Sequence, residues 1–503
     1  MSPVALPSGS SQPVDRQSKR TAFRVLLSFA LIAVSLGLSS CHSAAYYYYK
    51  FPEYNYAGRP IPPSKLAQRV MIAVSANGSF GSLQIVDASR DIRSNVENTI
   101  PTFSISGYSS GLPTAIYSFP SELRGYVYSN SDGSLTNIDY SSEAGKGPVG
   151  TFQSGTNSIA IPTTFAHYYG AESAAGILEV VEPGGGGPYL LNIPNVFRVA
   201  VNKGDTVALA MVRNSDVLYR IFRLNQNQYP TQQAAIAATG SVDCEPSILP
   251  VYCAVQVPGT YDRPYGVYFS LDGTTAYVLN CGPECGGKTA SVTLLQQGPL
   301  NTNVIPSSPT QPNPQIANVP VPGGVTEALS DGTTLYLAGQ QLQPDGLFAG
   351  FLSTMNMATN TITGKYSISD GTHTKMLFAD DNTLWIGSQY CATGERQKLG
   401  QNYNCLTRVV LGGSTLSPQV IPNVTPGGTT VVKYPNQNND QYYYGSLTGI
   451  CWVQNFNKIY TAYGGQVHVF NTSDGSERDN SFVTVAGTAL DVAYLDALTD
   501  DAD

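Results

Sequence analysis

The amino-acid sequence predicts an all-β protein, and two observations favour a β-propeller of four-stranded blades. The first is R-P-Y-G-V-Y-F-S-L-D-G-T-T-A-Y-V-L-N, from Arg263 to Asn280, in which alternating apolar residues flank a tight turn at Asp272-Gly273. The second is that weaker copies of this pattern recur at 330–339 and 379–388. Repeats of this kind indicate an array of small sheets, which a propeller closes into a ring.

Apolar or aromatic segments that can serve as the second strand of a blade recur along the chain. They centre near Ile72, Tyr126, Tyr168, Ala208, Tyr277, Tyr336, Trp385 and Tyr460. This pattern predicts eight blades, with seven as the alternative. Their spacing is wide for a propeller, and polar inserts at 183–188, 225–239, 299–322 and 434–445 account for the excess. No convincing amphipathic helix is found from Leu66 onward.

The two ends of the predicted ring complement each other. Arg69–Val74 is typical of a second strand with no inner strand before it, and Thr488–Asp496 of an inner strand with nothing after it. We expect these segments to pair and to close the ring, which removes its open sheet edges. The propeller is therefore placed at 66–498, followed by an acidic tail at 499–503. A run of separate small β-domains is the competing interpretation.

The N-terminus has the features of an export signal. A basic region is followed by the apolar run Val25–Leu38, which is too short for a spanning helix. The run ends L-S-S-C at Cys41, which resembles a bacterial lipobox. The resemblance implies a signal peptide at 1–40, cleavage before Cys41 and lipid attachment to it. An ordinary signal peptide with an incidental cysteine is the alternative.

The location expected of the mature chain follows from this signal. His42 after the lipidated cysteine resembles the class sorted to the outer membrane, so we expect a lipid-anchored protein of the cell envelope. Residues 41–65 are rich in Tyr and Pro and are interpreted as a tether, with plain disorder as the alternative. The formal net charge of −8 disfavours nucleic acid as a partner, because an acidic surface repels phosphates.

The remaining cysteines fall into local pairs. An exported chain meets an oxidising compartment, so we expect three short-range disulfides. The predicted pairs are Cys244–Cys253, Cys281–Cys285 and Cys391–Cys405, with Cys451 left as a buried thiol. A zinc site is the weaker alternative, because none of the four histidines lies near a cysteine pair.

The Arg263–Asn280 stretch is similar to the YVTN-type propeller repeat, which runs R-P-x-G-V-A-F-S-P-D-G and then Y-V-x-N. Leu271 stands where that repeat usually has Pro. The resemblance is good over one blade and partial over two or three others. It implies a propeller fold and carries no catalytic residues to this chain.

Two segments match catalytic motifs by letter. Gly282–Thr289 fits the P-loop pattern, and Gly107–Gly111 fits the G-x-S-x-G pattern of hydrolases. Both motifs require a following helix, whereas the residues that follow here are typical of strands and turns. We therefore interpret both segments as loops.

Clusters of carboxylates and the two tryptophans are also interpreted as structural. Asp380/Asp381 and Asp474/Glu477/Asp479 do not have the spacing of known Ca²⁺ loops, so solvated loops are expected there. Trp385 and Trp452 are expected to pack within blades, and their scarcity disfavours the quinone-cofactor propellers.

The sequence thus favours an exported, membrane-anchored propeller lipoprotein that acts as a binding or scaffold module. No catalytic residue, metal ligand or cofactor is assigned. Its expected partners are the membrane, through the lipid anchor, and an unidentified protein, small molecule or glycan. One alternative is a propeller enzyme of lactonase type, in which acidic or His residues gather at the channel mouth. Another is a subunit of an outer-membrane assembly machinery.

Overall fold

The computed structural model describes residues 56, 58–78, 80–92, 103–184, 187–308, 311–391, 404–413, 415–422, 424–425, 429–430, 444–478 and 483–500. The chain divides into two compact units, Met1–Gly58 and Arg59–Asp503. Within the described ranges, no helix is long and apolar enough to cross a membrane. Cys41, the signal peptide and most of the predicted tether lie outside those ranges.

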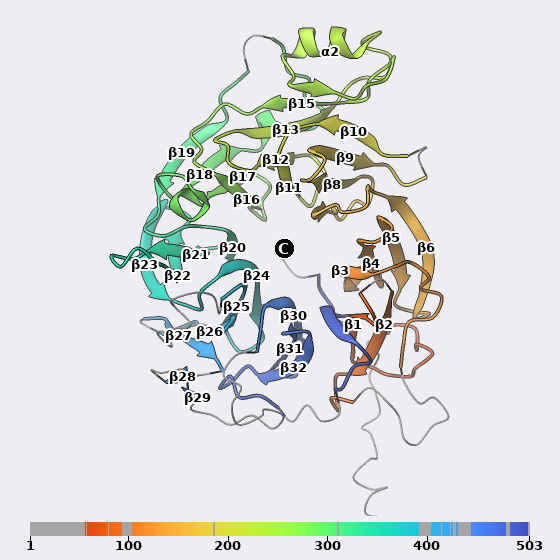
Figure 1. Ribbon diagram of the computed structural model, residues 1–503, viewed down its shortest axis with the longest axis vertical. Coiled ribbons are helices and arrows are strands. Elements are labelled where there is room, and N and C mark those ends of the chain that lie inside the picture. Colours follow the sequence, from red (N-terminus) through yellow and green to blue (C-terminus); the bar gives the residue numbers. More distant parts are fainter. Residues whose placement is uncertain are drawn as a thin grey trace, which may run out of the picture. The chain divides into compact units, whose positions relative to one another are not determined.

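The unit Arg59–Asp503 is a ring of eight antiparallel blades, as predicted (Figure 1). We number the blades in order around the ring and give their strands from the inner strand outward. Blade 1 contains β33 (Thr488–Tyr494), β1 (Arg69–Ser75) and β2 (Gly81–Asp87); blade 2 contains β3 (Pro113–Phe119), β4 (Arg124–Ser129), β5 (Ser134–Asp139) and β6 (Ala144–Thr151). Blade 3 contains β7 (Ser158–Ala160), β8 (Tyr168–Glu172), β9 (Ile177–Val181) and β10 (Tyr189–Asn192); blade 4 contains β11 (Val196–Val201), β12 (Ala208–Val212), β13 (Leu218–Arg223), β15 (Tyr252–Gln256) and β14 (Asp243–Cys244).

The second half of the ring follows the same plan. Blade 5 contains β16 (Pro264–Phe269), β17 (Thr275–Asn280), β18 (Ser291–Gln296) and β19 (Gln315–Pro320); blade 6 contains β20 (Glu327–Ser330), β21 (Thr334–Leu342), β22 (Phe348–Asn356) and β23 (Thr361–Ser367). Blade 7 contains β24 (Thr372–Ala379), β25 (Thr383–Gln389), β26 (Leu406–Val410) and β27 (Ser417–Ile421); blade 8 contains β30 (Leu447–Val453), β31 (Lys458–Tyr463) and β32 (Gln466–Asn471). Single bridges, Gln84 with Ser104 and Phe470 with Glu477, add a partial fourth strand to blades 1 and 8.

The predicted second strands are confirmed. Each of the eight residues named above lies in the second strand of its own blade: β1, β4, β8, β12, β17, β21, β25 and β31. These strands are buried on both faces because a neighbouring blade packs on each side, so they are almost continuously apolar. An apolar run of this kind marks the second strand of a blade in the sequence.

The ring is closed as predicted, by strands from the two ends of the chain. β33 pairs antiparallel with β1, with Val70 opposite Tyr494 and Ile72 opposite Val492. In Figure 1 the blue C-terminal strand completes the blade to which β1 and β2 belong. Buried apolar side chains of blades 1 and 8 form one continuous cluster across the closure, including Ile72, Val469 and Val492.

Blade 4 differs from the expectation in one respect. The polar insert at 225–239 contains a short helix, α2 (Gln232–Thr239). Thr231 caps its N-terminus by accepting a hydrogen bond from the backbone N–H of Ala234, and Gly240 ends it with φ of 68°. The chain thus forms a short helix here, although its sequence has no convincing amphipathic pattern. Only Ala235 and Thr239 of the helix are buried, so its apolar face was too narrow to produce a helical period.

The three predicted disulfides are present. The Cα separations are 4.0 Å for Cys244–Cys253, 5.7 Å for Cys281–Cys285 and 5.4 Å for Cys391–Cys405. Cys451 is a buried thiol on β30 that takes part in none of them.

Candidate functional site on the upper face of blades 4 and 5

The most regular repeat of the sequence, Arg263–Asn280, lies beside a pocket. We call the face on which the inner strands begin the upper face. Because adjacent strands are antiparallel, the loops between second and third strands lie there too. A pocket of about 260 Å³ opens on this face between blades 4 and 5. It is lined by Phe197, Val212, Arg213, Asn214, Arg263, Pro264, Tyr265, Cys281, Glu284 and Cys285.

The wall of this pocket contains the loop that matches the P-loop pattern. Gly282–Cys285 forms a single turn of 3-10 helix that is closed by the Cys281–Cys285 disulfide, and the strand β18 follows. Asp262 Oδ2 accepts hydrogen bonds from the backbone N–H groups of Lys288 and Thr289, both at 2.7 Å. The loop's own donors thus already hold a carboxylate, so it cannot cradle a phosphate. The interpretation as a hairpin loop is confirmed.

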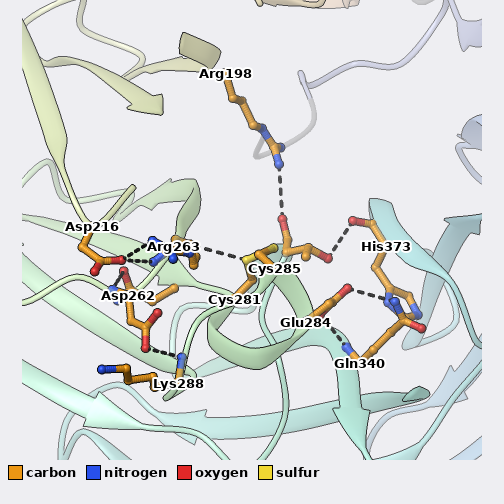
Figure 2. Close-up of a disulfide and its surroundings, with 12 residues drawn as sticks. Arg198, Asp216, Asp262, Arg263, Cys281, Glu284, Cys285, Lys288, Gln340 and His373 are labelled. Atoms are coloured by element: carbon orange, nitrogen blue, oxygen red, sulfur yellow. Dashed lines mark hydrogen bonds and ion pairs between the residues drawn. A yellow bond between two sulfur atoms is a disulfide. The ribbon is translucent and has the colours of Figure 1, made fainter. Parts of the chain in front are cut away.

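Two arginines give the pocket its basic character. The exposed guanidinium of Arg213 lies over the Phe197 ring, 4.8 Å from its centre, and has no ion-pair partner among the described residues. Arg263 pairs with Asp216 at 2.9 Å between Nη1 and Oδ1. Figure 2 shows Arg263 between Asp216 and the disulfide, with Glu284 turned away toward Gln340. One cation beside aromatic rings is therefore available to an anionic group of a ligand.

Glu284 ties this loop to blade 6. Its carboxylate accepts hydrogen bonds from the backbone N–H of Gln340 at 2.8 Å and from the Gln340 side-chain amide at 3.1 Å. Burial raises the pKa of Glu284 to about 7, although both donors oppose the rise. The charge of the pocket wall therefore changes near neutral pH.

We expect a measurable pH dependence of stability from Glu284. Its pKa is higher in the folded than in the unfolded chain, so its stabilising contribution is complete below about pH 4.5 and is lost as the pH rises through about 7. The free energy of unfolding, measured with urea at about pH 5 and about pH 8, should fall between these two pH values. The fall should be about 2 kcal/mol smaller for Glu284→Gln than for wild type. Glu122→Gln, at an exposed position, is the control and should behave as wild type. Equal losses in all three proteins would refute the assignment.

The channel wall carries charges at equivalent positions of different blades. The inner strands β3, β11, β16, β24, β30 and β33 share a β-bulge near their upper end. The residues that resume pairing after the bulge are Ala115, Arg198, Gly266, Lys375, Gly449 and Asp491. Two of them are basic, one is acidic, and the other three are small.

These charges form two ion pairs, each of which crosses an intervening blade. Arg198 Nη2 of blade 4 lies 3.0 Å from Glu327 Oε2 of blade 6, passing over Gly266 of blade 5. A Cβ atom on Gly266 would lie 3.3 Å from Arg198 Nη1, tighter than an ordinary contact. The guanidinium can therefore lie against the strand because this position lacks a side chain.

The second pair repeats the first. Lys375 Nζ of blade 7 lies 3.9 Å from Asp491 Oδ1 of blade 1, and the intervening blade 8 has Gly449 at this level. Asp491 also accepts a hydrogen bond from the backbone N–H of Ile116 in blade 2. Burial raises the pKa of Asp491, which Lys375 opposes. Both pairs are internally neutralised, so they join blades rather than present charge to a ligand.

A histidine with two carboxylates is found, but away from the inner strands. His167 Nδ1 is hydrogen-bonded to Asp205, and its Nε2 lies 3.8 Å from Glu182 Oε1. His167 precedes β8, Glu182 follows β9, and Asp205 lies between β11 and β12, so all three are on the lower face. Within the described part of the chain, no group of three or more His, Cys, Asp and Glu side chains is arranged to hold a metal ion.

The other residues named from the sequence are structural. Gly107–Gly111 is a turn between blades 1 and 2, as interpreted, and its Ser110 hydroxyl is hydrogen-bonded to Thr136. Trp385 is buried in β25, and its indole N–H donates to Thr383. Asp474 caps the turn at Ser476, whereas Asp479 lies outside the described residues.

Glu477 has a different environment from the one expected. Instead of lying in a solvated loop it is buried, and its carboxylate is bonded to His468 and Tyr444. The expectation for this residue was wrong because the segment after β32 folds back onto the blade through the Phe470–Glu477 bridge.

Sequence reasoning missed the charged residues of the channel wall and the unpaired arginine of the pocket. Arg198, Arg213, Glu327, Lys375 and Asp491 are far apart in the chain and belong to no motif. The strand-interior glycines at 266 and 449 were the available signal, because glycine inside a strand often marks a close approach. That signal does not say which side chain approaches.

Comparison with known proteins finds only distant similarity among the solved structures named below. No protein-family model and no curated protein sequence matches the chain. Among solved structures, the hydrazine synthase of Kuenenia stuttgartiensis is similar at 12% identity, over 72% of this chain and 96% of that one, with a TM-score of 0.44. The dihydro-heme d1 dehydrogenase NirN is similar at 11% identity, over 89% and 83%, with a TM-score of 0.49. A candidate 6-phosphogluconolactonase of Bacteroides fragilis is similar at 9% identity, over 85% and 97%, with a TM-score of 0.40.

The chain is a β-propeller by its own strand pairing. Similarity this distant implies no activity for this chain.

Proposed function

We propose that the protein is an exported, lipid-anchored propeller whose upper face binds a partner. The observation that carries the proposal is Arg213, an exposed cation that lies on the Phe197 ring in the pocket and has no ion-pair partner among the described residues. The other basic side chains that line the pocket or the channel wall, Arg263, Arg198 and Lys375, each have a carboxylate partner. An acidic group of a partner protein, such as a carboxylate side chain, complements the remaining cation.

Three disulfides support the exported location. They persist in oxidising compartments and are rare in the cytosol, where thiols are kept reduced. They agree with the lipobox-like sequence that ends at Cys41.

The lipid anchor is tested by metabolic labelling with a palmitate analogue. We expect the wild-type protein to be labelled and Cys41→Ser to remain unlabelled, because the lipid is attached at this thiol. Membrane fractions should contain the wild type and lose the variant. Equal labelling of the two proteins would rule out this anchor.

Partner binding on the upper face is tested by cross-linking in the intact envelope and purification of the tagged protein. Arg213→Glu should reduce recovery of the bound partner by about tenfold, because it reverses the charge at the pocket. Arg124→Glu is a matched control, because this guanidinium also lies over an aromatic ring, 5.0 Å from the centre of Phe165, but at the lower end of β4. Equal recovery with both variants would refute binding on the upper face. Recovery of the barrel-forming protein of the outer membrane would identify a subunit of that assembly machinery.

A lactonase-type enzyme is a weaker proposal. It would place carboxylates or a histidine at the channel mouth, whereas the group around His167 lies at the lower ends of second and third strands. His373 on the inner strand β24 is fully buried, and its Nε2 is hydrogen-bonded to the carbonyl oxygen of Ser369. Burial lowers the pKa of His373 to about 4, so this ring stays neutral at physiological pH.

A further inference from the structure

Blade 4 departs from the common plan of the ring on its lower face. After its third strand, the chain adds the helix α2, the extra strand β14 and the Cys244–Cys253 disulfide before it returns as β15. In Figure 1 this addition forms the outermost part of the blade. Beside it lies a cavity of about 590 Å³, within the usual range for sites that bind small molecules.

The wall of this cavity is rich in amide side chains. The lining residues are Tyr189, Arg223, Leu224, Asn225, Gln226, Asn227, Leu249, Pro250, Val251 and Asn303. Four of the ten are Asn or Gln, and their side-chain amides form no hydrogen bond with other described residues. Each amide offers two donors and one acceptor oxygen, a set that matches neighbouring hydroxyl groups, which both donate and accept.

The cavity has no net charge to offer a ligand. Arg223 is the only charged residue in its wall, and its Nη2 lies 3.2 Å from Glu182 Oε1. The same oxygen accepts a hydrogen bond from the Tyr252 hydroxyl at 2.6 Å. A guanidinium that is already neutralised attracts an anion weakly, so this chemistry favours an uncharged polar ligand.

The site is also held in shape before any ligand arrives. The buried guanidinium of Arg220 donates hydrogen bonds to the carbonyl oxygens of Pro299, Asn301 and Val304, which fixes the loop that presents Asn303. On the other side, the Tyr189 ring packs on Tyr252 with the ring centres 5.0 Å apart. A preformed wall lowers the entropy cost of binding.

We infer that this cavity binds a neutral saccharide. The amides bond its hydroxyl groups, and the Tyr189 ring offers an apolar face to the C–H groups of the sugar. The inference extends the proposed binding function to a second place on the ring. The saccharide inference can fail while the upper-face proposal stands, because the two sites share no lining residue and are tested with different variants.

The test begins with a glycan array that contains neutral oligosaccharides (glucans, xylans, mannans and chitooligosaccharides) and anionic ones. The affinity of the strongest ligand is then measured by calorimetric titration. We expect binding of a neutral oligosaccharide whose affinity is the same at low and high salt. The triple variant Asn225→Ala/Asn227→Ala/Asn303→Ala should lower this affinity by at least about tenfold, and so should Tyr189→Ala. Melting temperatures check that the variants are folded.

Gln233→Ala is the matched control. This amide is exposed on α2, in the same insert but outside the cavity, so its removal should leave the affinity unchanged. Arg213→Glu on the upper face should also leave it unchanged. Failure of every neutral oligosaccharide to bind would overturn the inference, as would binding that is salt-sensitive and restricted to anionic glycans, or binding that the folded triple variant retains.

Discussion

Deletion of residues 487–503 is expected to lower the melting temperature of the ring sharply and to promote its aggregation. It removes β33, the inner strand of blade 1, and with it the buried side chains of Val492 and Tyr494. It also exposes the inner edge of β1 and the adjacent faces of blades 8 and 2 at once. Thermal unfolding should begin at least about 10 °C lower, with aggregation seen by light scattering.

The control is deletion of residues 498–503 alone. This segment follows the last buried residue of the closure, Ala497, and Leu498 is 55% exposed. Its contacts are surface hydrogen bonds, such as that from the Ser121 hydroxyl to Asp500. The shorter deletion should therefore melt within about 2 °C of wild type. If the longer deletion also melts like wild type, the closure shown by the strand pairing does not support the stability of the ring.

Replacement of Arg69 by Met is expected to have the next largest effect. The guanidinium is 3% exposed and lies between two carboxylates, with Nη2 at 2.6 Å from Asp496 and Nη1 at 3.0 Å from Glu143. Met fills much of the same volume but removes the cation from Glu143 and leaves Asp496 only Arg59, whose Nη1 lies 4.0 Å from Asp496 Oδ1. The free energy of unfolding should fall by about 3–5 kcal/mol.

The pH dependence of this variant distinguishes charge from packing. Burial already raises the pKa of Asp496, and Arg69 opposes that rise. Without Arg69 the pKa rises further, so the variant binds more protons when folded and loses stability as the pH increases. Unfolding measured between about pH 5 and about pH 8 should show the defect shrinking toward low pH. The triple variant Arg69→Met/Asp496→Asn/Glu143→Gln should recover part of the lost stability. A defect that is constant with pH, with no recovery in the triple variant, would mean that packing alone is affected.

These two predictions concern the same place in the chain, where its ends meet. The strand pairing of β1 with β33 was predictable because each segment was recognisably an incomplete blade. The bond between Arg69 and Asp496 was not, although both residues lie within or next to those strands. A register is set by apolar periodicity, and this periodicity does not say which charged side chains meet, here Arg69 with Asp496 and Glu143.

The sequence alone determined the blades and the disulfides. Blades are local structures whose strands follow one another along the chain, so alternation and turn residues are sufficient to locate them. The three cysteine pairs are separated by 9, 4 and 14 residues, so they too are local features. The residues that follow Gly282–Thr289 are also a local signal: they predict a strand, whereas a P-loop requires a helix there.

Only the tertiary structure decided what the ring offers to other molecules. The upper pocket joins Arg213 of blade 4 to Glu284 of blade 5, and the channel ion pairs join residues that are more than one blade apart. The lower cavity depends on Arg220 of blade 4 holding a loop of blade 5. Contacts between blades are set by the closure of the ring and by the position of each bulge. Neither of these produces a periodic pattern in the sequence. The fold could therefore be predicted from local pattern, whereas its binding surfaces arise only where distant segments meet.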